Sequence, residues 1–312
     1  MESFKKSPLN LALGVAIVSL AMNAQAADKE IALTKVEDKK EKQFKVDKVA
    51  THKISTDLVD TPKTITVISS DLLEDQGVTS FSEALRNVSG VSTFEGGGGN
   101  ITVNDKLTIR GFSANENIYV DGIRDISGYS RDMFNYEQLE VSKGAGSSIT
   151  GKGSSGGAVN LVTKVAKKDD SFSNVAASYD QKQSLRLTVD SNQQLGDNVS
   201  GRFNGLLTDG GDYLDNGVAD YETTALAGSV LFDVFEKTDV VLNATYMKQD
   251  NVPVLGLPWI TEGVAQAHSL KEGAIDSSLW NKFYGVEGRD KQEVEFTQAT
   301  LLIEHQLTDD TY

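Results

Sequence analysis

The sequence of 312 residues contains no cysteine, only three histidines and only four prolines. The absence of cysteine excludes a disulfide-stabilised scaffold and any zinc or iron–sulfur site with cysteine ligands. The histidines, at positions 52, 268 and 305, are too scattered to suggest a transition-metal site. Basic residues are fewer than acidic ones: the sequence has 30 Lys and Arg against 45 Asp and Glu, for a net charge of −15. This balance argues against nucleic acid as the main partner, since phosphate recognition needs a basic surface.

Long hydrophobic runs are confined to the N-terminus. The basic pair Lys5 and Lys6 precedes the apolar stretch Leu9–Met22, and small residues follow it. This order is typical of a secretory signal, so we predict a signal peptide over residues 1–26, with a membrane anchor as the less favoured alternative. The stretch is shorter than the roughly 20 apolar residues that a spanning helix needs, and no later stretch approaches that length. An exported protein of this kind can enter a membrane only as β-strands.

Lysine, aspartate and glutamate dominate residues 27–54, which predicts a disordered tether. Two short islands within it, residues 30–36 and 44–49, alternate between apolar and polar side chains. An extended island of this type can add as a strand to the sheet edge of a partner protein. A plain linker with chance alternation remains the open alternative.

Residues 55–165 predict a compact α+β unit. Thr64–Ile68 alternates as a strand does, Ser70 is placed to cap a helix over 71–76, and Ser80–Glu83 forms a capping box that opens a second helix. Further strands are expected at 107–110, 118–120, 138–142 and 157–164. Because strands and helices follow no regular βαβ alternation, a doubly wound sheet is not expected.

A glycine-rich segment, Gly146–Lys152, matches the first seven positions of a phosphate-binding P-loop. The eighth position is Gly153 instead of Ser or Thr, and a strand-like segment follows where a P-loop needs a helix. We therefore expect the glycines to permit tight turns and close backbone approach, without nucleotide binding.

The remainder of the chain alternates with a period of two residues. Six strands are predicted, and the last shifts its alternation near Thr297 and Gln298, which predicts a β-bulge. Short turns follow the second and fourth strands, whereas longer loops follow the third and fifth, as in outer-membrane barrels. The alternation alone also fits a soluble β-sandwich.

Several motifs, in order and with suitable spacing, resemble the plug domain of TonB-dependent outer-membrane receptors. They are Thr64–Ile68, Ala84–Val91, Ile109–Phe112, Tyr119–Asp125, Leu139–Gly144 and Gly156–Lys164. Within this set, Arg124-Asp125 and Ser130–Asn135 are most similar to the catecholate-siderophore branch, the Fiu-like receptors.

The resemblance implies an α+β plug domain over residues 55–165, followed over 166–312 by the first strands of a transmembrane antiparallel β-barrel. The family closes this barrel with 22 strands, and about six are expected here. At the strand spacing of this sequence, 22 strands would take roughly 500 residues. We therefore expect the chain to be the N-terminal portion of a receptor, with the barrel incomplete.

The resemblance also implies TonB-dependent uptake of a ferric siderophore, of the catecholate class, across the bacterial outer membrane. Such a protein is a transporter and not an enzyme, and it needs no cofactor or protein-built metal site because iron arrives inside its chelator. The implied partners are TonB, the ferric siderophore and outer-membrane lipid, without nucleic acid. Two alternatives remain: a receptor for another cargo, such as a vitamin, heme or metal chelate, and a plug-bearing fragment that no longer transports.

Four residues are candidates for siderophore binding: Arg124, Tyr129, Arg131 and Phe134. A ferric catecholate is anionic, so the arginines are suited to pair with it and the aromatic rings to stack on the catechols. The alternative is that the arginines pair with neighbouring carboxylates, such as Asp125.

The resemblance implies roles for two further sets of residues. Arg110 is expected to lock the plug to the barrel, outside the ligand site. The TonB box, the segment that TonB binds by strand addition, is placed in the first island. Its residues are Glu30, Ile31, Ala32, Leu33, Thr34, Lys35 and Val36.

Overall fold

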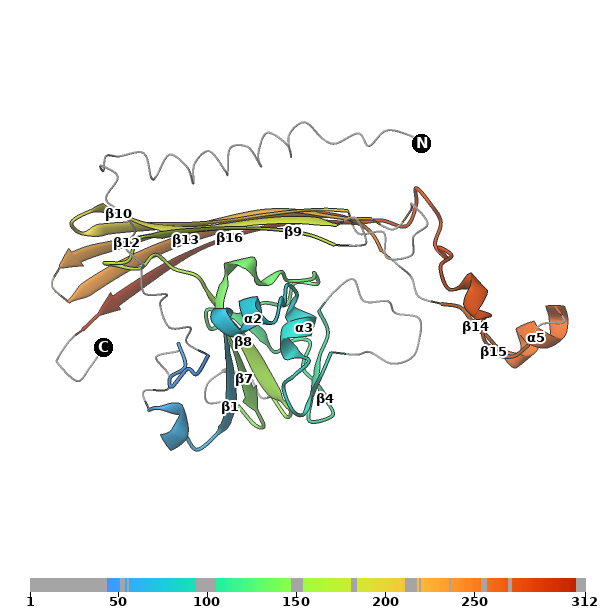
Figure 1. Ribbon diagram of the computed structural model, residues 1–312. Coiled ribbons are helices and arrows are strands. Elements are labelled where there is room, and N and C mark those ends of the chain that lie inside the picture. Colours follow the sequence, from blue (N-terminus) through green and yellow to red (C-terminus); the bar gives the residue numbers. More distant parts are fainter. Residues whose placement is uncertain are drawn as a thin grey trace. The chain divides into compact units, whose positions relative to one another are not determined.

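The structure, a computed structural model, describes residues 44–50, 54, 56–93, 105–146, 154–180, 184–210, 218, 220–235, 237–253, 257–268 and 271–306. These residues fall into two compact units that divide between Lys164 and Val165, and each unit is described by itself (Figure 1). The predicted signal peptide and TonB box lie outside the described residues. Among the helices that are described, none is long and apolar enough to cross a membrane.

In the residues that the structure describes, the first unit, here called the α+β unit, contains one main sheet and two short α-helices. Its main sheet has the strand order β1-β7-β8-β5-β6, in which only β5 and β8 run parallel. A smaller sheet has the order β2-β3-β4. The elements are η1 (Leu58–Asp60), β1 (Thr64–Ser69), α2 (Ser70–Asp75), α3 (Phe81–Leu85), β2 (Val91–Ser92), β3 (Thr108–Ile109), β4 (Phe112–Ser113), β5 (Ile118–Val120), β6 (Ile123–Arg124), η2 (Met133–Asn135), β7 (Tyr136–Lys143) and β8 (Gly157–Thr163).

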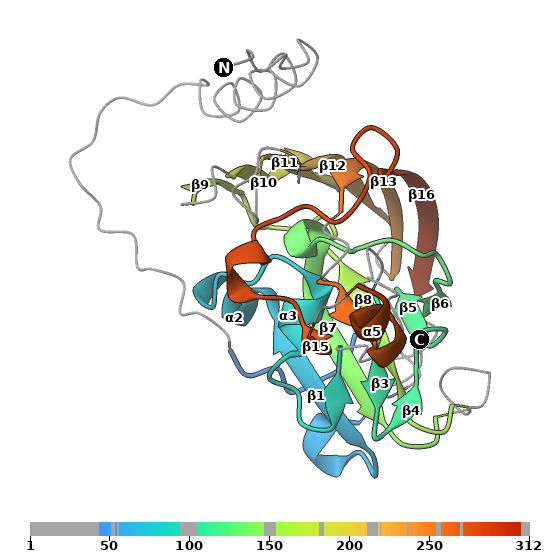
Figure 2. The ribbon, with the colours of Figure 1, turned by 90° about the vertical axis from the view of Figure 1, so that its right-hand side faces the viewer.

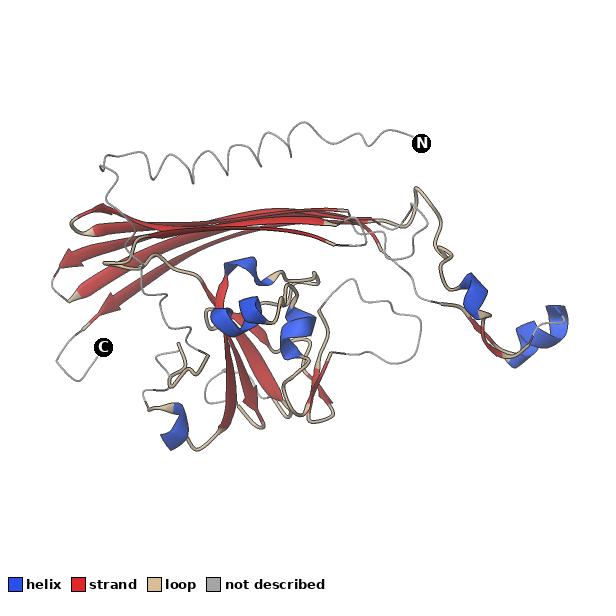
Figure 3. Cartoon of the chain, in the orientation of Figure 1, coloured by secondary structure: helices blue, strands red, loops and turns tan. Residues whose placement is uncertain are grey.

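The core of this unit lies between the main sheet and its helices, and Figure 3 shows α2 and α3 beside the strands. Alternate residues of the central strands point into it, as the period-two pattern predicts. Fully buried members include Phe81, Leu85, Leu139, Val141, Val159 and Leu161. The α+β prediction is therefore confirmed, and the elements lie close to their expected positions.

Both helices begin with a serine cap, but one prediction was wrong by a residue. Ser69, and not Ser70, caps α2, because its hydroxyl accepts a hydrogen bond from the Leu72 amide at 3.4 Å. Helix α3 begins as expected, since the Ser80 hydroxyl accepts from the Glu83 amide at 3.3 Å. The return bond of the capping box shifts to Thr79, whose amide donates to Glu83 Oε2.

Glycines at the start of β8 allow backbones to approach each other closely. A Cβ atom added to Gly156 would lie 2.3 Å from the carbonyl oxygen of Ile109. At Gly157, φ is +145° and an added Cβ would lie 2.2 Å from the carbonyl oxygen of Ser142. The expectation of close backbone approach is confirmed at these two positions. The P-loop-like residues 147–153 lie outside the described residues.

The second unit, here called the sheet unit, is a six-stranded antiparallel sheet with the order β16-β13-β12-β11-β10-β9. Figure 2 shows the sheet curving across its width from β9 to β16. The six predicted strands are confirmed in the described residues. They are β9 (Phe172–Tyr179), β10 (Leu185–Gly196), β11 (Val199–Asp209), β12 (Asp220–Phe235), β13 (Thr238–Val252) and β16 (Gln292–His305), and between the last two lie β14 (Trp259–Ile260), α5 (Glu262–His268), β15 (Gly273–Ala274) and η3 (Ser277–Leu279).

The two faces of this sheet differ in chemistry. One face, here called the apolar face, exposes large apolar side chains, among them Phe232, Leu242, Tyr246, Leu301 and Ile303. The opposite face, here called the polar face, buries Asn192, Arg202, Asn204, Ser229 and Gln249. On the polar face the Arg202 guanidinium holds both oxygens of the Asp190 carboxylate at 2.8 Å. Such a separation is the pattern of a membrane barrel wall with a polar interior.

The predicted β-bulge near Thr297 and Gln298 was wrong. The pairing of β16 with β13 continues without a register shift from Gln292 to His305. The apolar residues of β16 lie on different faces in its two halves, although the strand itself is regular. Phe296 pairs with Met247 on the polar face, whereas Leu301 pairs with Leu242 on the apolar face.

Candidate functional site

The candidate site is the connection between β6 and η2, here called the 125–131 loop. It follows the tight β5–β6 turn, in which Asp121 and Gly122 have φ values of +50° and +76°. The Asp121 carboxylate fixes this turn to β8, because it accepts hydrogen bonds from the amide and the hydroxyl of Thr163 at 2.8 and 2.7 Å. The loop therefore starts from a rigid sheet edge.

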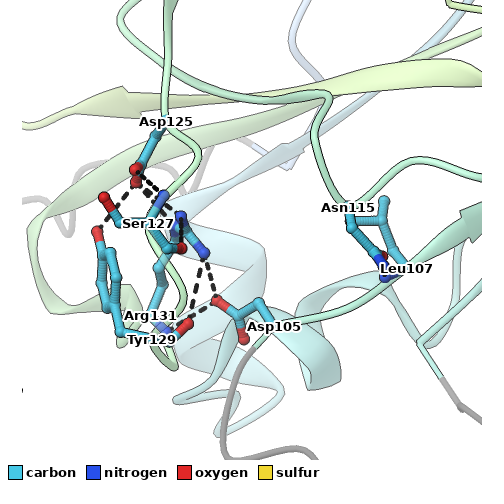
Figure 4. A network of polar contacts seen from close by, with 7 residues as sticks. All are labelled: Asp105, Leu107, Asn115, Asp125, Ser127, Tyr129 and Arg131. Carbon is cyan, nitrogen blue, oxygen red and sulfur yellow. Dashed lines mark hydrogen bonds and ion pairs between the residues drawn. The ribbon is translucent and has the colours of Figure 1, made fainter.

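A buried arginine organises the loop from within (Figure 4). The Arg131 side chain is 1% exposed, and all five of its N–H groups donate hydrogen bonds. Nε and Nη2 reach Asp125 Oδ2 at 3.2 and 2.7 Å, and Nη1 reaches Asp105 Oδ2 at 3.0 Å. The remaining two bonds go to the carbonyl oxygens of Ser127 and Tyr129. No donor of this guanidinium is left for an external anion.

The backbone beside Arg131 is fixed to the rest of the α+β unit. The Arg131 amide donates to Asp105 Oδ2 at 2.9 Å, and the Asp105 amide donates to the Tyr129 carbonyl at 3.1 Å. The Phe81 amide, at the first residue of α3, donates to the Arg131 carbonyl at 3.0 Å. The side chain of Arg131 thus extends from a fixed position back into its own loop.

Tyr129 lies inside the same network. The residue is 3% exposed, and its ring packs against the Arg131 guanidinium, with 4.3 Å between Cζ and the ring centroid. Its hydroxyl donates to Asp125 Oδ2 at 3.3 Å, and burial raises its pKa. The Tyr129 ring is therefore buried in the interior of the loop.

The network holds two carboxylates for one guanidinium. Burial raises the pKa of Asp105 to about 6, in spite of the nearby Arg131. Burial also works against the charge of Asp125, but Arg131 outweighs it and lowers the pKa of that carboxyl below its ordinary value. Asp125 is thus the firmly ionised partner, and Asp105 is the group that titrates at mildly acidic pH.

Arg124 and Phe134 flank the network and are less enclosed than Tyr129 and Arg131. The Arg124 side chain is 29% exposed and donates from Nη2 to Glu116 Oε2 at 2.8 Å. Glu116 is itself largely exposed, so this surface ion pair contributes little to stability. Arg124 Nε also donates to the Glu116 carbonyl oxygen at 2.5 Å. Phe134 is half-buried in η2. Of the two predicted arginines, Arg124 is the one that faces solvent.

Sequence reasoning missed the exposed tip of the loop. Ile126 is 73% exposed, and Ile123 at the start of β6 is 60% exposed. Between polar neighbours, an isolated isoleucine in the sequence gave no signal of its own. Both isoleucines are exposed apolar side chains close in sequence to Arg124, whose side chain is 29% exposed.

Arg110 lies in the β3–β4 turn with φ of +53° and is exposed. Its amide donates to the Gly90 carbonyl at 2.8 Å. Its predicted role concerns contact between the two units and stays a prediction. Elsewhere in the described ranges, no group of three or more histidine or acidic side chains is arranged to hold a metal ion.

Comparison with known proteins gives consistent matches. The family described as TonB-dependent Receptor Plug Domain matches residues 57–158. The probable TonB-dependent siderophore receptor PiuA of Acinetobacter baumannii is 34% identical over 300 residues, covering 96% of this chain and 39% of that protein. The catecholate siderophore receptor Fiu of Escherichia coli K12 is 33% identical over 312 residues, covering 96% and 40%.

Solved structures of the same two receptors agree. The crystal structure of PiuA matches with a TM-score of 0.76 at 34% identity, covering 86% of this chain and 37% of that one. The closed form of Fiu matches with a TM-score of 0.75 at 33% identity, covering 85% and 38%. The chain thus spans about two fifths of the length of the curated relatives that it matches.

Proposed function

Since the chain belongs to the TonB-dependent siderophore receptors, which are outer-membrane proteins and not enzymes, we propose that it takes part in uptake of a ferric siderophore across that membrane. Similarity to PiuA and Fiu over 96% of the chain is the observation that carries this proposal. TonB supplies the energy for the transport step, and no bond of the ligand is broken.

A catecholate complex is the proposed ligand class. Strand β6 and the 125–131 loop support it, because they carry a partly exposed cation, Arg124, and two exposed aliphatic side chains, Ile123 and Ile126. A ferric tris-catecholate combines a net negative charge with three aromatic rings, so it can pair with a cation and pack against aliphatic side chains. Phe134 is a second candidate contact, since its ring is only partly buried.

Two partners are proposed besides the ligand. TonB binds the segment Glu30–Val36 as an added strand, and its sequence alternation supports this assignment. Outer-membrane lipid contacts the apolar face of the sheet unit, where Leu242, Leu301 and Ile303 expose 48, 62 and 60% of their surface. Arg110 is proposed to lock the plug domain to the barrel wall.

Uptake of radiolabelled iron tests the proposal. Cells that lack their own catecholate receptors should accumulate iron from a ferric tris-catecholate only when they express the protein and are energised. A Leu33→Pro variant removes one backbone donor from the added strand, so it should bind the complex without importing it. Equal accumulation with and without the protein would reject the proposed function.

A further inference from the structure

We propose that Arg131 does not touch the ligand and instead positions the 125–131 loop, so that Arg124 and Ile126 are presented to it. The part of this inference that concerns the ligand rests on the proposed function. The part that concerns the loop rests on the structure alone.

The donor geometry of Arg131 carries the first step. Its five N–H groups are used inside the protein, and both carboxylates that it binds are nearly enclosed, with side chains of Asp105 and Asp125 that are 2% and 12% exposed. An anion outside the loop would have to displace one of these carboxylates from a buried charge pair. Breaking such a pair leaves a buried charge uncompensated, which is strongly unfavourable.

The path of the chain gives the second step. The guanidinium binds the loop at Asp125, Ser127 and Tyr129, which are alternate residues, while the Arg131 backbone is held by Asp105 and Phe81. The loop is thereby tied to one fixed point through the Asp125 carboxylate at its start and through the carbonyl oxygens of Ser127 and Tyr129 further along. Between these attachments, Ile126 and Gly128 are exposed.

Lysine cannot replace arginine in this role. A single ammonium group has three donors at one point, whereas the network needs five donors spread in a plane towards two carboxylates and two carbonyls. A role as a simple positive charge near an anionic ligand would be preserved by lysine. The two roles therefore predict different results.

The test uses Arg131→Gln, Arg131→Lys and Asp125→Asn in the whole chain, purified from outer membranes. Arg86→Gln is the matched control, because Arg86 is an exposed arginine of the same unit, at the end of α3. Hydrogen exchange of the Asp105 and Arg131 amides is measured without ligand. The affinity for a synthetic tris-catecholate loaded with ferric iron is measured on the same samples.

The positioning role predicts that all three test variants exchange both amides at least about tenfold faster, while β7 and β8 stay protected. It also predicts that all three bind the complex at least about tenfold more weakly, and that Arg86→Gln changes neither quantity. Asp125→Asn is decisive, because removal of a negative charge near an anionic ligand would tighten binding if charge alone mattered.

Tighter or unchanged binding by Asp125→Asn, together with rescue of affinity by Arg131→Lys, would overturn the proposal and make Arg131 a ligand contact. If the unmodified protein does not bind the complex, the proposed ligand class is wrong. Hydrogen exchange then still decides the positioning role, since unchanged exchange in the Arg131 and Asp125 variants would reject it.

Discussion

Replacement of Asp105 by asparagine should remove a pH dependence from the stability of the α+β unit. The Asp105 carboxyl is buried, and the positive charge of Arg131 compensates it only in part. Asp125 is the stronger ionic partner of the Arg131 guanidinium. Asparagine keeps an oxygen that accepts from the Arg131 amide and from Nη1, but it carries no charge. The variant therefore isolates the cost of the buried charge.

The magnitude follows from the pKa of Asp105, which is raised from 3.8 to about 6. A difference of about two units corresponds to about 3 kcal/mol between the two protonation states. Because the pKa in the folded state is raised, this contribution is fully present below pH 3.8 and is lost as pH rises through about 6. About 1 kcal/mol of the loss falls between pH 5 and pH 7.

Hydrogen exchange of the slowest amides in β7 and β8 measures the free energy of unfolding of this unit. Between pH 5 and pH 7, the unmodified protein should lose about 1 kcal/mol relative to Asp105→Asn. An exposed acid on α2 provides the control, so Asp75→Asn should follow the unmodified protein. Parallel pH profiles for the unmodified protein and Asp105→Asn would show that Asp105 carries no buried charge that opposes folding.

Two matched pairs of substitutions test the packing of each unit. Gly156→Ala should destabilise the α+β unit by about 3 kcal/mol, because the added Cβ would lie 2.3 Å from the Ile109 carbonyl oxygen. Gly77→Ala would place its Cβ within 4 Å of no atom, so it should cost only about 1 kcal/mol, which comes from the positive φ at this position. Chemical denaturation measures both, and equal losses would contradict the close approach. Leu301→Arg, on the apolar face, should lower the stability of the sheet unit in detergent or lipid by about 2–4 kcal/mol, whereas Leu302→Arg, on the polar face, should be tolerated. Equal tolerance in a refolding titration would contradict the assignment of the faces.

The regular parts of both units could be predicted because their signals are local. A period of two residues along β10 to β13 follows from one polar and one apolar face, and no distant information is needed. The serine caps were also visible, although neighbouring serines at 69 and 70 offered two possible starts for α2. Backbone position, which the sequence does not contain, decides between them.

The interior of the 125–131 loop could not be predicted for a different reason. Arg124 and Arg131 look alike in the sequence, and both have acidic neighbours. What separates them is Asp105, which is 26 residues away from Arg131 along the chain and joins the loop only through the tertiary fold. Long-range pairing of this kind sets which arginine is buried and which faces solvent.

The β16 strand shows a third limit. A change of apolar residues from one face to the other was interpreted as a bulge, because a strand was expected to have one environment along its whole length. The structure instead gives two environments to a regular strand, with Phe296 on the polar face and Leu301 on the apolar face. Side-chain pattern alone does not distinguish these cases.

The absence of cysteine makes a direct measurement of the ligand's location possible. A fluorophore attached to Ile126→Cys would report on the exposed tip of the loop, and one attached to Val59→Cys on η1 serves as the comparison. Addition of the ferric tris-catecholate should quench the label at position 126 saturably and leave the label at position 59 unchanged. Absence of quenching at position 126, with binding demonstrated on the same sample, would contradict the placement of the ligand at the 125–131 loop.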